Sequence, residues 1–566
     1  MRRRSPTPPA STAPVAGLPG GWAAALLAIV VLAAAALRLV LPGQAPPGLN
    51  QDEAINAWNA WCLLHTGRDM VGAPWPVFYA HAIGDNRTTL YFYALLPFQA
   101  LGGLGVWTTR LPAIIAGTAA VLLVYVAGAR LAGRAAGLLA AVLMALEPWP
   151  LFLSRWGIEG SLCPPLAVLP LALLLLAGAP LADTVPPPRA RPWLAGLAGL
   201  AAGVACYGYW PLRIHVPVFL ALAAAFTWPA VAEWSRDRGG RRALLAFAAT
   251  FAATFGPLAW QHLVDPEIAR RAEMTRLWEP GTPPAEVLGL VAGRYLGHFG
   301  LDFLFVRGDP LDILAPIGQG QFHWTMLPLL AAGALAAIVR FRRSRAARLL
   351  VALVLAYPAG DLISQHVGIH SLRSAPGVPA LVLLAAYGGV SAWGWLAARR
   401  RRLAPVAAAV FLVVMAALDA RYLLRYFGEY GRRPEIYHGY HVDLLEATRW
   451  LHPRLERYDE VYVTATGMNE PFAVTLVGLG YDARRWFREP REWTRLGDWD
   501  VCLRYGRMRF LYGDHWRRHV EAEQADGRDR PVLFIVRPGE LGLSEPVHVI
   551  RRPDGRETLW LCEGTL

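Results

Sequence analysis

The chain has 566 residues, of which 55% are hydrophobic and 17% are charged, and its mean hydropathy is +0.32. Average soluble domains carry about a quarter charged residues, so this composition excludes an ordinary soluble protein and predicts a membrane protein with many spans. The formal net charge of +13 does not indicate nucleic-acid binding, because the basic residues, all of them Arg, cluster in short segments between apolar runs.

Residues 1–20 are rich in Pro, Ser and Ala, and we expect them to be disordered and cytoplasmic. Beyond them the sequence predicts about eleven membrane-spanning helices, because many apolar runs approach or exceed the ~18 residues typical of a span. The predicted spans are 21–41, 111–130, 135–153, 162–179, 193–210, 214–233, 243–262, 322–340, 346–363, 374–397 and 403–424.

The segment 89–103 is apolar but short, and Pro97 interrupts it. We expect a helix that lies in the membrane interface; an extra pair of crossings is the alternative.

The arginines predict which side of the membrane each loop faces. With the N-terminus in the cytoplasm and alternating spans, every short Arg-dense loop falls on the cytoplasmic side, as the positive-inside rule requires. These loops carry Arg130 and Arg134, Arg189 and Arg191, and the arginines of 236–242, 340–348 and 399–402. The protein is therefore expected in the plasma membrane, with the segments 42–110 and 263–321 and the tail outside the cytoplasm.

The tail, 425–566, is more polar than the rest and contains strand-like runs such as VYVTAT (461–466) and PVLFIVRP (531–538). A Pro-Asp-Gly turn at 553–555 separates two further β-like stretches, which is a hairpin signal. We expect a small extracytoplasmic α/β domain. Cys502 and Cys562 lie in it, either paired or as free thiols. The absence of a Walker loop, and of a GxGxxG after a strand, argues against a nucleotide cofactor.

Nearly all the notable polar motifs fall on the predicted outer face. They are PPGLNQDEA, GDNRTTLYFYALLP, TTRLPAIIAG, EPWPLFLSRWGIEGS and, late in the chain, HSLRSAPGVPALVLLAAYG. In this order they resemble the GT-C superfamily of membrane glycosyltransferases, in particular the phospholipid-carrier-dependent branch with protein O-mannosyltransferases and the lipid A aminoarabinose transferase. The resemblance covers about residues 20–400 and implies a GT-C module over 21–424.

The resemblance implies an inverting enzyme that moves a sugar from a polyprenyl-phosphate carrier to an extracytoplasmic acceptor hydroxyl on a protein, lipid or glycan. It also implies an essential acidic residue in the first external loop. The matching position is Asp52, with Glu53 beside it. A carboxylate there can take the proton of the acceptor hydroxyl. Glu53 has either a part in the chemistry or an indirect role in loop structure or acceptor contact.

The departing phosphate needs cations, and Arg offers bidentate contacts to it. The candidates on the outer face are Arg373, Arg87, Arg213 and Arg155. Arg373 lies in HSLRS, where the family often has an aromatic residue in place of Ser374, a departure from the pattern.

Asp85 and Glu159 are further candidates, for binding the acceptor or a metal. The simpler interpretation of Asp85 is a turn residue in GDN, and that of Glu159 is an ion pair with the nearby Arg155. His366 and His370 could hold a metal if they lay on one helix, but Gly368 between them disfavours a helix. The residues therefore leave the need for a divalent cation undecided, as they do the sugar and the acceptor.

The main alternative function is a multispan transporter or a flippase of lipid-linked sugars. Such proteins carry charged or broken segments at mid-membrane. Here the spans are mostly Leu, Ala and Val, and the polar residues gather at one face, which favours chemistry at the membrane surface.

Overall fold

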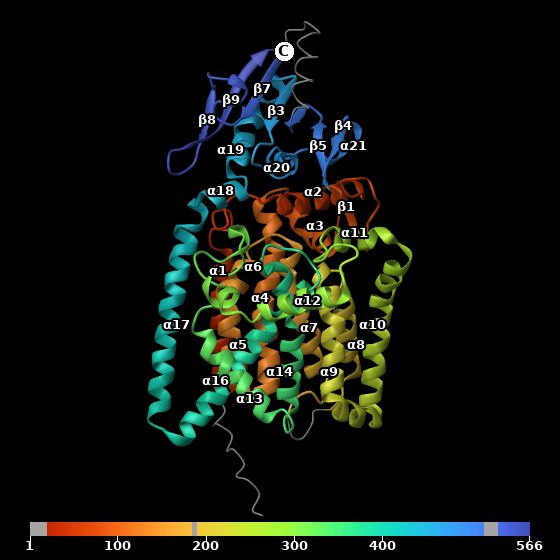
Figure 1. Ribbon diagram of the computed structural model, residues 1–566, viewed down its shortest axis with the longest axis vertical. Helices are drawn as coiled ribbons and strands as arrows, with labels where there is room; N and C mark the ends of the chain where they lie inside the picture. The colour runs from red at the N-terminus through yellow and green to blue at the C-terminus, as the bar shows by residue number, and fades with distance from the viewer. Residues whose placement is uncertain (1–19, 184–188, 498, 514–529, 566) are drawn as a thin grey trace, which may run out of the picture.

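The computed structural model describes residues 20–183, 189–497, 499–513 and 530–565. A bundle of long helices forms the body of the molecule, and a domain built on a β-sheet sits on one end of it (Figure 1). This is the predicted combination of a polytopic helical part and a C-terminal α/β domain.

Each of the eleven predicted spans contains a helix. The helices are α1 (Gly20–Leu39), α4 (Val106–Ala132), α5 (Arg134–Leu146), α7 (Cys163–Leu176), α8 (Pro192–Ala205), α9 (Trp210–Arg236), α10 (Arg238–Val264), α13 (Met326–Arg340), α14 (Arg345–Ala356), α16 (Val378–Arg399) and α17 (Leu403–Gly428). Within the described part of the chain, seven helical segments are both long and apolar enough to cross a membrane. The chain is thus a multi-pass membrane protein.

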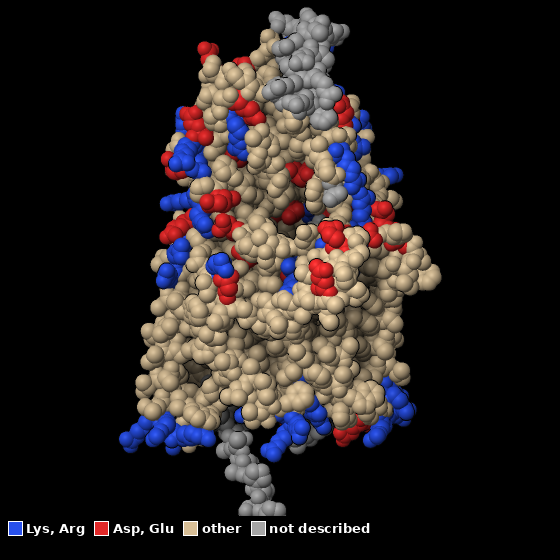
Figure 2. All heavy atoms as spheres, in the orientation of Figure 1, with Lys and Arg blue, Asp and Glu red and all other residues tan. Residues whose placement is uncertain are grey.

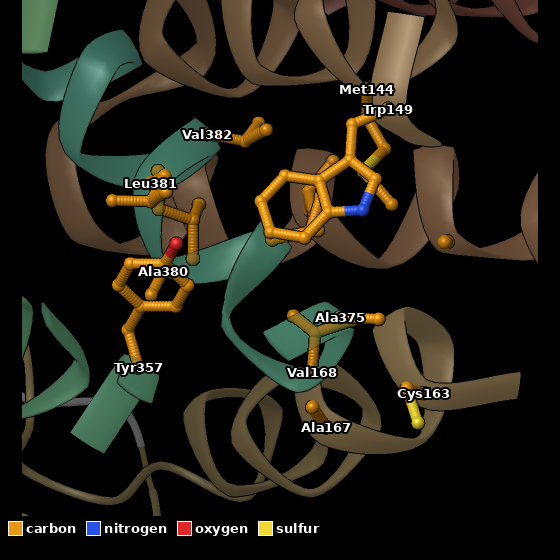
Figure 3. Packing of buried hydrophobic residues seen from close by; sticks show 14 of the residues in the cluster. Met144, Trp149, Cys163, Ala167, Val168, Tyr357, Ala375, Ala380, Leu381 and Val382 are labelled. Carbon is orange, nitrogen blue, oxygen red and sulfur yellow. The ribbon is translucent and has the colours of Figure 1, made fainter. Parts of the chain in front are cut away.

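Proline accounts for one of the shorter helices. Helix α5 ends before Pro148, which opens the separate helix α6 (Pro148–Leu153), because proline lacks the N–H that would continue the preceding helix. The core of the bundle forms around Trp149, which packs with Met144 of α5, Tyr357, and Val382 of α16 (Figure 3).

The first long connection, between α1 and α4, contains α2 (Gln51–Thr66), the short hairpin β1 (Ala80–Ala82) and β2 (Asp85–Arg87), and α3 (Leu90–Gly102). Helix α3 has 13 residues and therefore extends about 20 Å at 1.5 Å per residue. This is shorter than the ~30 Å hydrocarbon core of a bilayer. The segment 89–103 is accordingly one short helix and not an extra pair of crossings.

The second long connection, between α10 and α13, carries short helices. They are η2 (Pro266–Ala269), α11 (Arg270–Met274), α12 (Pro284–Gly297), the π-helical turn η3 (Asp302–Val306) and η4 (Asp312–Leu314). Between α14 and α16 the chain passes through η5 (Tyr357–Asp361), a stretch without regular structure, α15 (Ser371–Ser374) and η6 (Ala375–Gly377).

The C-terminal domain is a seven-stranded sheet in the order β4-β5-β6-β3-β7-β9-β8. Its strands are β3 (Glu460–Thr464), β4 (Arg491–Leu496), β5 (Trp499–Tyr505), β6 (Met508–Leu511), β7 (Pro531–Val536), β8 (His548–Arg551) and β9 (Glu557–Thr565). The fully buried β3 runs parallel to both of its neighbours, and the other pairs are antiparallel. The predicted strand runs and the hairpin around 553–555 are confirmed.

The helices of this domain are α18 (Pro434–Gly439), α19 (Val442–Leu451), α20 (Pro471–Gly478) and α21 (Ala483–Arg488). Cys502 and Cys562, on β5 and β9, are free thiols, so of the two alternatives for them the unpaired one holds.

Helix α2 belongs to the hydrophobic core of the sheet domain although it comes from the first connection of the helical part. Its Ile55, Trp58 and Cys62 are in one cluster with apolar residues of α19, α20 and the central strands. Trp58 meets Trp486 of α21 edge-on, with ring centroids 5.7 Å apart. The first connection and the C-terminal domain therefore form one packed unit above the helical bundle.

Arginines gather at the end of the molecule opposite the sheet domain (Figure 2). The connections α9–α10, α13–α14 and α16–α17 lie at that end (Figure 1), and they carry the Arg-dense stretches 236–242, 340–348 and 399–402. The positive-inside rule thus predicts that this end faces the cytoplasm and that the sheet domain faces away from it.

Single cysteines at the two ends test this orientation. Arg556→Cys, in the exposed β8–β9 turn, should react with a membrane-impermeant maleimide in intact cells, whereas Arg400→Cys, exposed between α16 and α17, should react only after permeabilisation. The unaltered protein is the control, because all five of its cysteines are buried. Labelling of Arg400→Cys but not of Arg556→Cys in intact cells would show that the orientation is the opposite one.

Candidate functional site

A cavity of about 480 Å³ lies where the helical part meets the sheet domain. Its walls come from the first connection (Asp52, Asp85, Arg87), from the starts of helical segments (Glu159, Trp210) and from the sheet domain (Glu470, Tyr512). Figure 2 shows a hollow at this level with acidic side chains inside it. The predicted site residues Asp52, Asp85, Arg87 and Glu159 thus lie in one cavity.

Asp52 lies in the first turn of α2, whose N-terminus is fixed by a capping box. The Asn50 side chain accepts a hydrogen bond from the backbone N–H of Asp52, and the Glu53 side chain accepts one from the N–H of Asn50. Acidic residues in a first turn are also favoured by the helix dipole. The Asp52 side chain is 37% exposed and lines the cavity, so its carboxylate is accessible to a ligand.

Arg87 is the cation nearest to Asp52. Its Nη2 lies 2.5 Å from Asp52 Oδ1, and its Nη1 lies 3.7 Å from Glu159 Oε1. Burial lowers the pKa of this guanidinium, but the two carboxylates outweigh burial and hold the pKa above its ordinary value. Arg87 is therefore a permanent cation that fixes Asp52. The ion-pair partner of Glu159 is Arg87, and not Arg155 as the sequence suggested.

Asp85 is the turn residue of the simpler interpretation, and its binding of an acceptor or a metal stays a prediction. It follows the tight turn at Gly84, where φ is 79°, and its Oδ1 accepts a hydrogen bond of 2.7 Å from the N–H of Asn86. It is also buried and lines the cavity.

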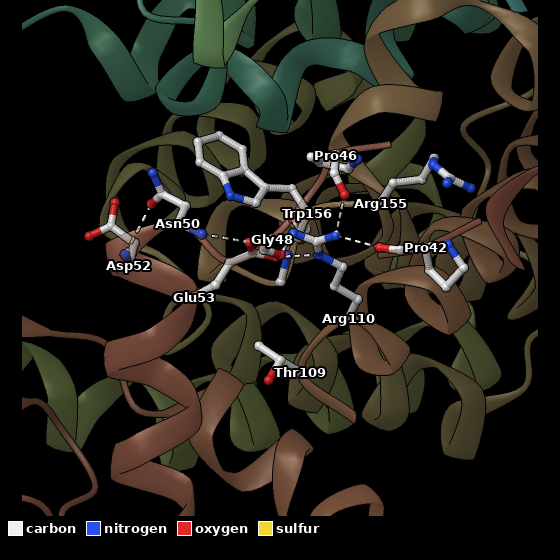
Figure 4. A network of polar contacts seen from close by, with 12 residues as sticks. Pro42, Pro46, Gly48, Asn50, Asp52, Glu53, Thr109, Arg110, Arg155 and Trp156 are labelled. Atoms are coloured by element: carbon white, nitrogen blue, oxygen red, sulfur yellow. Dashed lines mark hydrogen bonds and ion pairs between the residues drawn. The ribbon is translucent and has the colours of Figure 1, made fainter. Parts of the chain in front are cut away.

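Glu53 does not line the cavity. Its side chain is fully buried and turned away from Asp52 (Figure 4). Oε1 accepts hydrogen bonds of 2.7 Å from Arg110 Nε and the N–H of Gly157, and Oε2 accepts bonds from Arg110 Nη2 and the N–H of Asn50. The physical reason is helix geometry, since consecutive residues point about 100° apart. Of the two expected roles, this arrangement corresponds to loop structure.

Two arginines fix the connection between α1 and α2 by hydrogen bonds to its backbone, a role that the sequence analysis did not predict for them. Arg110 donates to the backbone oxygens of Pro42, Pro46 and Gly48 (Figure 4). Arg155 donates to the oxygens at the end of α1 and to that of Ala45. Neither arginine lines either of the two cavities of the site.

A second cavity of about 400 Å³ adjoins the first and shares Tyr209 and Trp210 with it. Side chains of α9 and α10, including Phe255 and Leu258, give it mainly apolar walls. Arg213 and Arg373 both line it, so the structure brings together two of the four predicted phosphate ligands, while Arg87 lies in the neighbouring cavity and Arg155 lines neither.

The two arginines of the second cavity are bound to neutral partners. Arg213 Nη2 donates to the backbone oxygen of Phe78 at 2.9 Å, Nη1 lies 3.2 Å from His262 Nε2, and the guanidinium stacks 3.8 Å from the Trp210 ring centroid. Arg373 Nη1 donates to the oxygen of Gln365 at 3.1 Å. Within the described part of the chain, neither forms an ion pair with a carboxylate, which leaves both charges available for an anion.

Glu470 is a cavity residue that the sequence analysis did not identify. It precedes α20 in the sheet domain, with a left-handed backbone at φ 49°, and it is buried. Burial raises the pKa of its carboxyl to about 7, against the opposing effect of Arg87. Among the described residues its Oε2 has no hydrogen-bond partner. Backbone strain of this kind is found at functional sites, and no local motif marks Glu470 in the sequence.

Comparison with known proteins identifies the fold. No protein-family model and no curated protein matches the chain. The crystal structure of ArnT from Cupriavidus metallidurans bound to undecaprenyl phosphate matches with a TM-score of 0.51 and 14% sequence identity, over 96% of this chain and 98% of that chain. The oligosaccharyltransferase of Archaeoglobus fulgidus matches with a TM-score of 0.48 and 14% identity, over 81% of this chain and 64% of that chain. ArnT is a GT-C glycosyltransferase, and the chain, aligned with it over almost its whole length, has the fold of the GT-C superfamily.

Proposed function

We propose that the chain is a glycosyltransferase that takes a sugar from a polyprenyl-phosphate carrier and transfers it, with inversion, to an acceptor on the extracytoplasmic side of the membrane. The observation that supports it best is the pair of adjoining cavities with different chemistry. One is apolar and contains two arginines that have no acidic partner among the described residues, and the other is polar and contains carboxylates. The similarity to an ArnT structure that holds undecaprenyl phosphate agrees with this assignment.

The apolar cavity suits the lipid donor. A prenyl chain would lie against Phe255 and Leu258 between α9 and α10, and its phosphate would meet Arg213 and Arg373. Guanidinium groups bind phosphate through paired hydrogen bonds and keep their charge when partly buried. Because Tyr209 and Trp210 line both cavities, a sugar on that phosphate would extend past them into the polar cavity.

The polar cavity suits the reaction. The acceptor hydroxyl attacks the anomeric carbon from the face opposite the phosphate, and Asp52 takes its proton. The new carbon–oxygen bond forms as the bond from the anomeric carbon to the phosphate oxygen breaks, and the phosphate leaves with the electron pair. Arg87 fixes the direction of the Asp52 side chain through their ion pair, and Glu53 positions the helix that carries Asp52.

The acceptor would enter along the sheet domain, because the donor occupies the membrane side of the site. Glu470, Trp499 and Tyr512 form that wall of the cavity. A transporter or flippase remains the alternative function, but carboxylates concentrated at one end of the helices fit surface chemistry better than passage through the membrane.

Asp52→Asn tests the proposed base. Purified protein in detergent is offered several polyprenyl-phosphate sugars, and transfer or hydrolysis is followed. The variant should lose about 10²–10⁴-fold in kcat, the usual contribution of a general base, while its affinity for the carrier stays within about twofold. Full activity in the variant would remove Asp52 from the chemistry, and no turnover of any lipid-linked sugar by the unaltered protein would favour the transporter.

Glu53→Gln is the matched comparison, since it alters the neighbouring carboxylate. It leaves the buried Arg110 without its acidic partner, and breaking a buried ion pair costs about 3–5 kcal/mol. The melting temperature should therefore fall clearly in Glu53→Gln and little in Asp52→Asn.

Arg213→Gln and Arg373→Gln test the proposed phosphate contacts. Each should weaken binding of polyprenyl phosphate by roughly 10–100-fold, because a hydrogen bond to a charged group is worth about 1.5–3 kcal/mol. Arg307→Gln is the control: this arginine is exposed, lies outside both cavities and binds Asp302. If Arg213→Gln and Arg373→Gln bound polyprenyl phosphate as tightly as Arg307→Gln does, the apolar cavity would not be the donor site.

Glu470→Gln tests whether the pKa of this carboxyl is raised in the folded protein. The folded-state pKa of about 7 lies above the ordinary value of 4.5, so the folded protein holds this proton more tightly and loses stability as pH rises from about 4.5 to about 7. The variant should be more stable than the unaltered protein at pH 8, by at most about 3 kcal/mol, with no difference below about pH 4.5. Thermal unfolding of both proteins across this pH range checks the prediction. A stability difference between them that does not change with pH contradicts it.

A further inference from the structure

A second group of polar side chains lies outside both cavities. Asp309 comes from the connection between η3 and η4, and His366 and His370 come from the irregular stretch before α15. His366 Nε2 lies 3.2 Å from Asp309 Oδ1, and His370 Nδ1 lies 3.8 Å from Asp309 Oδ2. The three donor atoms lie within 4.8 Å of one another, and the two imidazole rings are 4.4 Å apart.

We propose that Asp309, His366 and His370 bind a divalent metal ion of the zinc class. Zinc accepts imidazole nitrogen and carboxylate oxygen, and its bonds of about 2.0–2.1 Å place tetrahedral ligand atoms about 3.3 Å apart. The shortest distance in the group, 3.2 Å, has this size, and all three donor atoms lie within 4.8 Å of one another. Two imidazoles and one carboxylate leave a fourth position for water.

The backbone around the group already holds the ligands in place. Asp309 Oδ2 accepts a hydrogen bond of 2.8 Å from the N–H of Ser371, and Oδ1 accepts one of 3.0 Å from the N–H of Leu311. The N–H of His370 donates to Asp361 Oδ2, and Arg294 Nη2 donates to both carboxylate oxygens of Asp361. Outer contacts of this kind orient metal ligands, so binding would require little reorganisation of the chain.

The ion would take no part in the proposed transfer, because none of its three ligands lines either cavity. It would join two irregular segments that are far apart in sequence. The segment with both histidines also holds Arg373, whose guanidinium donates to the oxygen of Gln365, the residue next to His366. Gln365 in turn donates to the oxygen of Thr275 at 2.6 Å.

The metal would therefore fix the loop that holds Arg373 against the apolar cavity. This last consequence rests on the proposed function, whereas metal binding itself does not.

The test is zinc binding by the full chain. Protein purified in detergent is treated with a chelator, the chelator is removed, and Zn²⁺ alone is titrated by calorimetry. We expect one ion per chain, and His366→Ala should weaken binding by about 100-fold or more, since even outer contacts of a metal site contribute 10–100-fold. His452→Ala, an exposed histidine of the sheet domain, is the matched control and should bind as the unaltered protein does.

A second readout keeps the test decisive if a variant folds poorly. Co²⁺ in place of Zn²⁺ should give the unaltered protein a visible d–d absorption band that is absent from Asp309→Asn. Chelation should also lower the melting temperature of the unaltered protein and of His452→Ala, but not that of His366→Ala. No zinc bound by the unaltered protein, or unchanged binding in His366→Ala, overturns the proposal. If zinc binds but does not change the affinity for polyprenyl phosphate, the metal site stands and its proposed link to Arg373 is wrong.

Discussion

The buried ion pair between Glu53 and Arg110 is the interaction on which the site depends. Two charges taken out of water are costly, and a buried pair persists only where additional hydrogen bonds satisfy both partners. Here Glu53 also accepts the N–H groups of Asn50 and Gly157, and Arg110 also binds backbone oxygens of the α1–α2 connection. One pair therefore fixes the start of α2 against α4, and the direction of Asp52 follows because it is the adjacent residue in the same turn.

Close backbone contacts around this pair leave no room for larger residues. A Cβ on Gly157 would lie 2.7 Å from the backbone oxygen of Thr109 and 3.0 Å from Glu53 Oε1. A Cβ on Gly48, which has φ 54°, would lie 2.2 Å from the oxygen of Tyr440. The second contact ties the first connection to the chain just before the sheet domain. Because α2 also lies in the core of that domain, packing holds the two walls of the polar cavity together.

The sequence predicts those features that depend on local pattern. Hydropathy placed a helix in each of the eleven expected ranges, and β-like runs indicated the sheet domain. Asn50 and Glu53 form an N-x-x-E capping pattern, a signal in the sequence that indicates a structural glutamate. Glu470 and Asp309 are different, since each acquires its neighbours from segments far away in the chain. A pattern in a single sequence carries no information about such contacts, so these two residues required the structure.

Charge compensation decides where an anion can bind. Arg87 lies between two carboxylates, and a phosphate beside it would also meet the negative charges of Asp52 and Glu159. Arg213 and Arg373 have only neutral partners among the described residues, so their field is not cancelled, and apolar walls strengthen it by lowering the local dielectric. These charges therefore favour an anion in the apolar cavity. On the proposed function, the phosphate would stay there, and the proton leaving the acceptor would move the opposite way, toward the carboxylates. The proposed reaction would then have a direction, with the leaving group on the membrane side of Tyr209 and Trp210 and the base on the side of the sheet domain.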